Sequence, residues 1–170
     1  MRLKSMTYVS IMSVMIAICA WLTIPAPVPF TMQTFGVFFA LLFLGGKRGI
    51  AAILLYLILG AAGLPVFSGF SGGIGHILGA TGGYMLGFLI IGIIYAAFEK
   101  ITKSKKALIF SLIPGLMLCY IFGTLWFSVY KGNISFLPAL TVCVLPFIVP
   151  DLIKLAIAVI VSERIKKSSY

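Results

Sequence analysis

Acidic residues and histidine are scarce in this chain, in which Asp and Glu together number 3 among 170 residues and histidine occurs once. Asp151 alone among the acidic residues lies well inside an apolar stretch, so no carboxylate pair is available there for acid–base chemistry. One histidine cannot complete a nucleophile–histidine–acid set, and no Gly-Lys-Ser/Thr sequence of a P-loop occurs. We therefore expect neither an enzyme nor an ATPase.

Cysteine is rare as well, and its placement excludes two further classes of site. Cys19, Cys119 and Cys143 lie in separate apolar segments and form no C-x-x-C pair. Their number and spacing indicate small buried hydrophobic residues rather than a disulfide framework. His76 has no neighbouring metal-ligating residues. We predict no metal site and no cofactor.

Charged residues make up only 9% of the chain, while 62% of its residues are hydrophobic. Soluble domains carry about 25% charged residues. The composition therefore predicts an all-α integral membrane protein, with residues 1–170 forming a single domain. The net charge of +10 does not indicate nucleic-acid binding, because the basic residues occupy short tips between apolar segments and form no soluble basic face.

Six apolar runs are candidates for transmembrane helices. A span needs about 20 apolar residues, so the second and third runs are short and are expected to be tilted or surrounded by protein. The six expected spans are Met6–Ile24, Phe30–Gly45, Ile50–Leu64, Gly83–Phe98, Ala107–Phe127 and Val142–Val161.

The basic residues fall on one side of this predicted topology. They are Arg2, Lys4, Lys47, Arg48, Lys100, Lys103, Lys105, Lys106, Arg164, Lys166 and Lys167. Lys131 stands alone on the opposite side. Because basic connections stay in the cytoplasm, both termini are predicted to be cytoplasmic. Six spans agree with this, because an even number places both termini on the same side of the membrane. We expect a multi-pass protein of the bacterial plasma membrane.

A glycine-rich connection, Gly60–Gly82, lies between the third and fourth spans and is predicted to be extracellular. Glycine lets chain segments approach closely and lets backbone N–H groups point at a ligand. A flexible surface loop is one interpretation. The apolar content of the loop, including Phe67 and Phe70, favours a lid that packs down over a site.

Asp151 and Lys154 are the charged residues that lie well inside an apolar stretch, and their spacing of three puts them on one face of a helix. An ionisable residue at membrane depth costs roughly 2.5–3.5 kcal/mol and usually marks a substrate or ion site. Pro150 suits the first position of a helix, so Asp151 is predicted in the first turn of the last helix. A structural ion pair is the alternative interpretation.

Three further positions are candidates from their chemistry. Gln33, beside Thr34, offers a donor and an acceptor to a ligand or to a neighbouring helix. Tyr84 is either a wall of the pocket or an interfacial aromatic residue. Ser13 and Ala17 form a small-x-x-x-small face on the first helix, where a partner protein is predicted to dock.

Five segments between positions 27 and 154 resemble the BioY family in the family's order: PFTMQTF, GGKRG, YLILGAAGLPVF, TGGYMLGF and DLIK. This family comprises the biotin-specific substrate-binding membrane subunits of energy-coupling-factor (ECF) transporters. Each segment alone is weakly specific, whereas five in order are strongly so. The chain departs from the family at Ala80, where proline is usual, and this affects loop geometry more than ligand chemistry.

The resemblance implies a six-helix bundle that captures biotin from outside. It also implies partnership with a transmembrane coupling subunit and two cytoplasmic ATPases. The D-x-x-K motif of the family contacts the ligand, which carries over to Asp151 and Lys154. The polar part of the lid carries over to Ser68, Ser71, Gly72 and Gly73, and Phe67 and Phe70 would cover the apolar ring of biotin.

Other functions remain open at this point. The same architecture could carry another vitamin, such as thiamine or riboflavin. A membrane scaffold with a structural Asp–Lys pair belongs to a different class, as does an intramembrane enzyme, which the missing catalytic groups disfavour.

Overall fold

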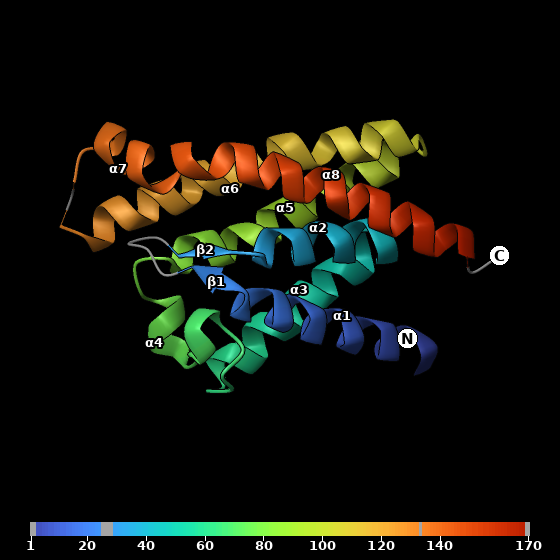
Figure 1. Cartoon of the computed structure of the whole chain (residues 1–170), viewed down its shortest axis with the longest axis horizontal. Helices are drawn as coiled ribbons and strands as arrows, with labels where there is room; N and C mark the ends of the chain where they lie inside the picture. Colours follow the sequence, from blue (N-terminus) through green and yellow to red (C-terminus); the bar gives the residue numbers. More distant parts are fainter. Residues whose placement is uncertain (1–2, 25–28, 133, 169–170) are drawn as a thin grey trace.

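The computed structural model describes residues 3–24, 29–132 and 134–168, so Arg2 of the predicted topology lies outside it. Figure 1 shows the long helices lying side by side along one axis. Both termini emerge at the same end, which we call the terminal end. The opposite end, which we call the loop end, holds the short strands and short helices.

The elements follow one another in the order α1 (Leu3–Trp21), β1 (Thr23–Ile24), β2 (Phe30–Thr31), α2 (Gln33–Leu44), α3 (Gly46–Ala61), η1 (Ser68–Phe70), α4 (Ile74–Ile77), α5 (Gly82–Ile101), α6 (Lys105–Tyr130), α7 (Phe136–Cys143) and α8 (Leu145–Ser168). Among the described residues, α1, α5, α6 and α8 are long and apolar enough to cross a membrane. The prediction of a helical membrane protein is thus confirmed. The antiparallel pair β1–β2, with Thr23 opposite Thr31, is an addition that the sequence analysis did not foresee.

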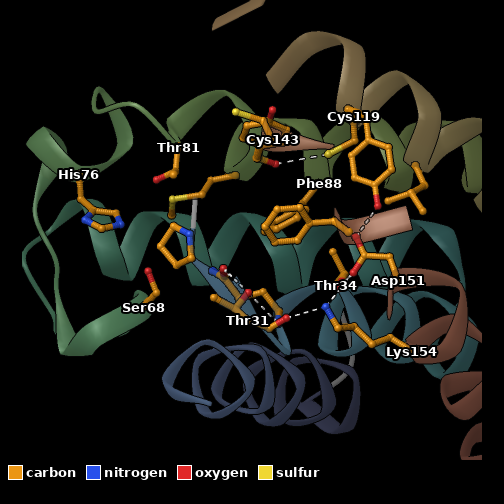
Figure 2. A pocket seen from close by; sticks show the side chains of 17 residues that line it. Thr31, Thr34, Ser68, His76, Thr81, Phe88, Cys119, Cys143, Asp151 and Lys154 are labelled. Atoms are coloured by element: carbon orange, nitrogen blue, oxygen red, sulfur yellow. Dashed lines mark hydrogen bonds and ion pairs between the residues drawn. The ribbon is translucent and has the colours of Figure 1, made fainter. Parts of the chain in front are cut away.

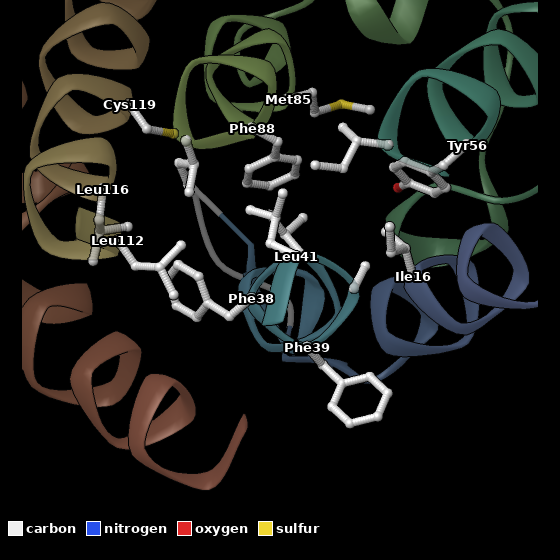
Figure 3. Packing of buried hydrophobic residues seen from close by; sticks show 14 of the residues in the cluster. Ile16, Phe38, Phe39, Leu41, Tyr56, Met85, Phe88, Leu112, Leu116 and Cys119 are labelled. Atoms are coloured by element: carbon white, nitrogen blue, oxygen red, sulfur yellow. The ribbon is translucent and has the colours of Figure 1, made fainter. Parts of the chain in front are cut away.

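Helix α2 is the centre of the molecule, packed against α1, α3, α5 and α8 (Figure 3). Beyond Thr34 it carries no polar side chain, and Val37, Phe38, Ala40 and Leu41 are completely buried. A helix of this pattern belongs inside a protein core. Its 12 residues reach only about 18 Å, far short of the 30 Å of a bilayer core.

Helices α5 and α6 approach closely because glycines face the opposite helix. A Cβ atom on Gly83 would lie 2.3 Å from Cβ of Trp126, and one on Gly87 would lie 2.6 Å from Sγ of Cys119. Across the same contact, a Cβ atom on Gly123 would lie 2.2 Å from the ring of Tyr84. This small-residue spacing is typical of tightly packed membrane helices.

The last helix begins earlier than predicted. Helix α8 starts at Leu145, and Pro150 lies inside it, so the prediction that Asp151 occupies its first turn is wrong. Two prolines lie four residues apart, and the earlier one, Pro146, takes the first turn, where no N–H donor is needed. The predicted span Val142–Val161 is therefore divided between α7 and α8.

The small residues of α1 face the interior. Ser13 is 1% exposed and Ala17 is 4% exposed, which contradicts the prediction that they form a docking face for a partner. They instead belong to the face on which α1 packs against the other helices, where a Cβ atom on Gly36 of α2 would lie 3.1 Å from Cα of Ile16. The motif is real, but its use is internal packing.

Candidate ligand-binding site

A cavity of about 70 Å³ lies in the half of the molecule toward the loop end. It gathers residues from β2, α2, η1, α4, α5, α6, α7 and α8 and from the segments that connect them. Its lining is Pro29, Thr31, Gln33, Thr34, Ser68, His76, Thr81, Tyr84, Met85, Phe88, Leu116, Cys119, Tyr120, Cys143, Phe147, Asp151 and Lys154. Five of the ten predicted ligand contacts are among them, namely Gln33, Ser68, Tyr84, Asp151 and Lys154.

Asp151 and Lys154 form a buried ion pair, with 2.7 Å between Nζ and Oδ1. Asp151 is 3% exposed and Lys154 is 4% exposed. Two hydroxyl groups also donate to the carboxylate: Thr34 Oγ1 to Oδ1 at 2.8 Å and Tyr120 OH to Oδ2 at 2.6 Å. Donors from α2, α6 and α8 thus converge on one carboxylate, which offsets the loss of water around it.

The ammonium group of Lys154 is held from three directions. Besides the carboxylate, it donates to the main-chain carbonyl of Thr31 at 2.7 Å, and it lies 4.3 Å from the centroid of the Phe30 ring. An aromatic face attracts a cation. These contacts tie β2 to α8, and Figure 2 shows the Lys154 ammonium group bonded both to Thr31 and to Asp151.

Gln33 and Tyr84 line the cavity and are also bonded within the protein. Gln33 Nε2 donates to the Tyr56 hydroxyl at 2.6 Å, and the Thr31 hydroxyl donates to Gln33 Oε1 at 3.0 Å. The hydroxyl groups of Tyr84 and Thr124 lie 3.0 Å apart, joining α5 to α6. Gln33 therefore makes the interhelical bond that was one of its two predicted roles.

The two aromatic residues predicted to cover the ligand do not line the cavity. Phe67 is completely buried, with its ring edge-on to Tyr56 at 5.5 Å between centroids. Phe70 is 64% exposed and stacks on Trp21 at 5.0 Å, on the outside of the loop. Neither ring takes the position expected from the sequence, because in an irregular loop the direction of a side chain does not follow from its spacing in the sequence.

Ser71, Gly72 and Gly73 shape the loop rather than line the cavity. Gly73 has φ +92° and donates its N–H to the Gly60 carbonyl at 2.7 Å. A Cβ atom on Gly72 would lie 2.3 Å from the Leu64 carbonyl oxygen. None of the three lines the cavity, since these residues fold the loop onto itself.

His76 does line the cavity, and its ring stacks on that of Phe67 at 5.2 Å. The hydroxyl of Ser71 donates to the Ser68 carbonyl at 2.7 Å and lies 3.1 Å from His76 Nδ1. Because the single hydroxyl proton is used by the carbonyl, Nδ1–H is the donor and Nε2 remains an acceptor. Burial lowers the pKa of His76, so the ring is neutral at pH 7.

The cavity has two polar ends and an apolar middle (Figure 2). Asp151, Lys154 and Thr34 lie at the inner end, while Ser68, His76 and Thr81 lie toward the loop, with Phe88 between the two groups. Tyr120 and the Thr31 carbonyl are site groups that the sequence analysis missed. Tyr120 could have been found, because a tyrosine inside an apolar span is visible in the sequence. The Thr31 carbonyl could not, because every residue has a main-chain carbonyl.

Comparisons with known proteins agree with this arrangement. A family model described as the BioY family matches residues 1–169. The probable biotin transporter BioY of Pyrococcus horikoshii is 42% identical over 167 residues, covering 98% of both chains. The biotin transporter BioY of Thermotoga maritima is 36% identical and covers 97% of both chains.

A solved structure shows the same fold. The crystal structure of the S-component for biotin from an ECF-type ABC transporter matches with a TM-score of 0.87 and 30% identity, covering 98% of this chain and 92% of that one. The resemblance noted in the sequence is thus confirmed. This chain belongs to the BioY family.

Proposed function

We propose that this protein is a biotin uptake subunit, which captures biotin at the loop end and delivers it inward. Its relatives are named biotin transporters, and the structure it matches is titled an S-component for biotin. The observation that carries the proposal to this chain is the buried ion pair at the inner end of a cavity whose middle is apolar.

The ion pair has hydrogen-bonding capacity to spare. A carboxylate accepts about four hydrogen bonds and an ammonium group donates three. Within the described residues, Asp151 accepts three and Lys154 donates two. One acceptor and one donor therefore remain side by side, and this pattern matches the N–H and C=O edge of the cyclic urea of biotin.

The remaining lining fits the rest of the ligand. Phe88, Met85 and Phe147 provide apolar walls for the thioether ring, and small-ligand pockets are mostly apolar with few polar anchors. Ser68 and Thr81 offer hydroxyl donors to the carboxylate tail. In this orientation Lys154 contacts the urea and not the tail.

The cavity must widen to accept a ligand. Its volume of about 70 Å³ is well below the roughly 300–1,000 Å³ of small-molecule sites. The connection between α3 and α5 carries Ser68 and His76 and is the part of the wall with the least regular structure. We propose that it opens as a lid.

The proposed topology has six spans formed by one domain, with α2 and α3 as short spans enclosed by protein and with both termini in the cytoplasm. The basic tips gather at the terminal end, where Figure 1 places both termini. The chain is a transport subunit and not an enzyme. We propose that an ECF transmembrane coupling subunit and two cytoplasmic ATPases supply its energy.

Isothermal titration calorimetry of the detergent-purified protein tests the proposal. Biotin, thiamine and riboflavin are titrated into the wild type and into Asp151→Asn, Lys154→Met and the control Lys131→Gln. Thermal unfolding of each variant shows whether it is folded. We expect tight binding of biotin alone, lost in both site variants and retained in the control.

Two outcomes contradict the proposal. Folded wild type that binds thiamine or riboflavin but not biotin would be an S-component for another vitamin. Folded wild type that binds none of the three would make the ion pair structural.

A further inference from the structure

A second hollow lies at the terminal end, between the end of α2, the beginning of α6 and the last turns of α8. Its volume is about 730 Å³. It is lined by Leu42, Tyr95, Lys105, Leu108, Ile109, Val159, Ser162, Glu163, Lys166 and Lys167. None of these residues lines the biotin cavity, so the hollow is a separate feature.

The rim of this hollow is basic. Its lining includes three lysines, Lys105, Lys166 and Lys167, and one carboxylate, that of Glu163. Lys105 is also the first residue of α6, where the positive end of a 26-residue helix adds to its charge. The rim therefore keeps a net positive charge despite the single carboxylate, and it attracts an anion.

The floor of the hollow is apolar. Leu42 is buried, while Leu108, Ile109 and Val159 are half-buried and come from membrane-length helices or from the core. The helices that line the hollow also carry exposed apolar residues: Ile101 of α5 is 82% exposed, Phe110 of α6 is 65% exposed and Ile160 of α8 is 52% exposed. A small free anion gains no binding energy from an apolar floor, whereas a hydrocarbon chain would pack against it.

We propose that this hollow binds an anionic phospholipid, with the phosphate of the headgroup between Lys105 and Lys167 and an acyl chain on the apolar floor. Charge complementarity at the rim and an apolar floor are the two features that a lipid of this class needs. The proposal does not depend on biotin binding.

Lys166 has a structural task beside this one. Its Nζ donates to the main-chain carbonyl of Leu42 at 2.9 Å, in the last turn of α2, where helix carbonyls lack partners of their own. Removing Lys166 would thus disturb α2 whether or not a lipid binds. The test is accordingly built on Lys105 and Lys167.

Native mass spectrometry of the full chain, purified with an equimolar mixture of phosphatidylglycerol and phosphatidylcholine, tests the proposal. The test variant is Lys105→Gln/Lys167→Gln. The matched control is Lys47→Gln/Lys103→Gln, which removes the same charge outside the lining of the hollow. Each lysine near a membrane surface contributes about a fivefold factor, so we expect retention of phosphatidylglycerol to fall about 25-fold in the test variant.

A third variant probes the floor. Ile109→Trp fills the hollow without changing its charge, and we expect it to lower retention of phosphatidylglycerol while leaving biotin binding unchanged. Glycerol 3-phosphate is added in a separate arm to distinguish a lipid from a soluble phosphate compound, and we expect it not to displace the lipid.

Three results would overturn the proposal. The first is equal retention of phosphatidylglycerol and phosphatidylcholine by the wild type. The second is an equal loss in the test and control variants, which would indicate general surface charge. The third is displacement by glycerol 3-phosphate, which would make the hollow a site for soluble anions.

Discussion

The two ends of the molecule differ in the burial of their charged side chains. Toward the loop end, Asp151 and Lys154 are almost completely buried and are bonded to each other and to neighbouring groups. At the terminal end the charged side chains are exposed, and the carboxylate of Glu99 receives the Gly46 N–H at 2.8 Å at the start of α3. The same residue types thus form a buried pair at one end and cap a helix or remain exposed at the other.

The difference follows from the free-energy cost of removing a charged group from water. A buried ion pair is weak evidence for stability, because taking two charges out of water offsets most of their attraction. Its persistence at the inner end of a cavity is therefore better explained by a ligand than by folding. Exposed charges carry no such penalty, so they are numerous where orientation is decided.

The largest effect is expected from unpairing the buried charges. Asp151→Ala leaves the Lys154 ammonium group buried without its carboxylate, and the free energy of unfolding should fall by about 3–5 kcal/mol. Denaturant titration in detergent measures it. Glu163→Ala at the terminal end should change stability by less than about 0.5 kcal/mol.

The double variant Asp151→Ala/Lys154→Met sharpens this result. It removes both charges, so most of the lost stability should return while biotin binding stays absent. Equal instability of the single and double variants would show that the carboxylate acts through its hydroxyl donors and not through Lys154.

A smaller effect is expected from Tyr120→Phe, which deletes the 2.6 Å hydrogen bond to Asp151. Hydrogen bonds to charged groups contribute about 1.5–3 kcal/mol. We expect biotin affinity, measured by calorimetry, to fall by roughly tenfold or more, because the carboxylate is no longer held in place. Tyr130→Phe, at a tyrosine that is 55% exposed, is the matched control and should bind as the wild type does.

At the terminal end, Glu99→Gln should lower stability by about 0.3–1 kcal/mol, since the amide oxygen still accepts from Gly46 but the charge at the start of α3 is gone. The deficit should shrink in 1 M salt, because exposed charges separated by more than the Debye length of about 3 Å are then largely screened. A salt-independent deficit would mean that the hydrogen bond, and not the charge, matters there.

The smallest effect concerns pH. Because burial lowers the pKa of His76 below its usual 6.5, the folded protein favours the neutral ring. Stability from this group is full above pH 6.5, is lost as the pH falls below that value, and levels off once the pH is below the lowered pKa. The Tm of the wild type should therefore fall between pH 7.5 and 5.5 by more than that of His76→Gln. Parallel pH profiles would exclude His76 as the cause.

Much of this architecture was predictable from the sequence, but the site was only half so. The ion pair stands out because charge is rare in apolar runs, and its spacing of three fixes a shared face. Phe67, Phe70 and Ser71 were expected at the site but do not line the cavity, because a loop has no periodicity from which to infer side-chain direction. Thr31 contributes a carbonyl, which every residue has, so its role could only emerge from the fold.

The shortness of α2 has a consequence for how the pocket depth is set. The helix covers about 18 Å of a 30 Å layer, and the space beyond its first turn is where Gln33 and Thr34 meet the cavity. Helix length thus acts as a ruler: one additional turn at this end would fill the chamber with backbone, whichever side chains it carried. The residue at which α2 begins therefore limits the size of the cavity independently of the side chains that line it.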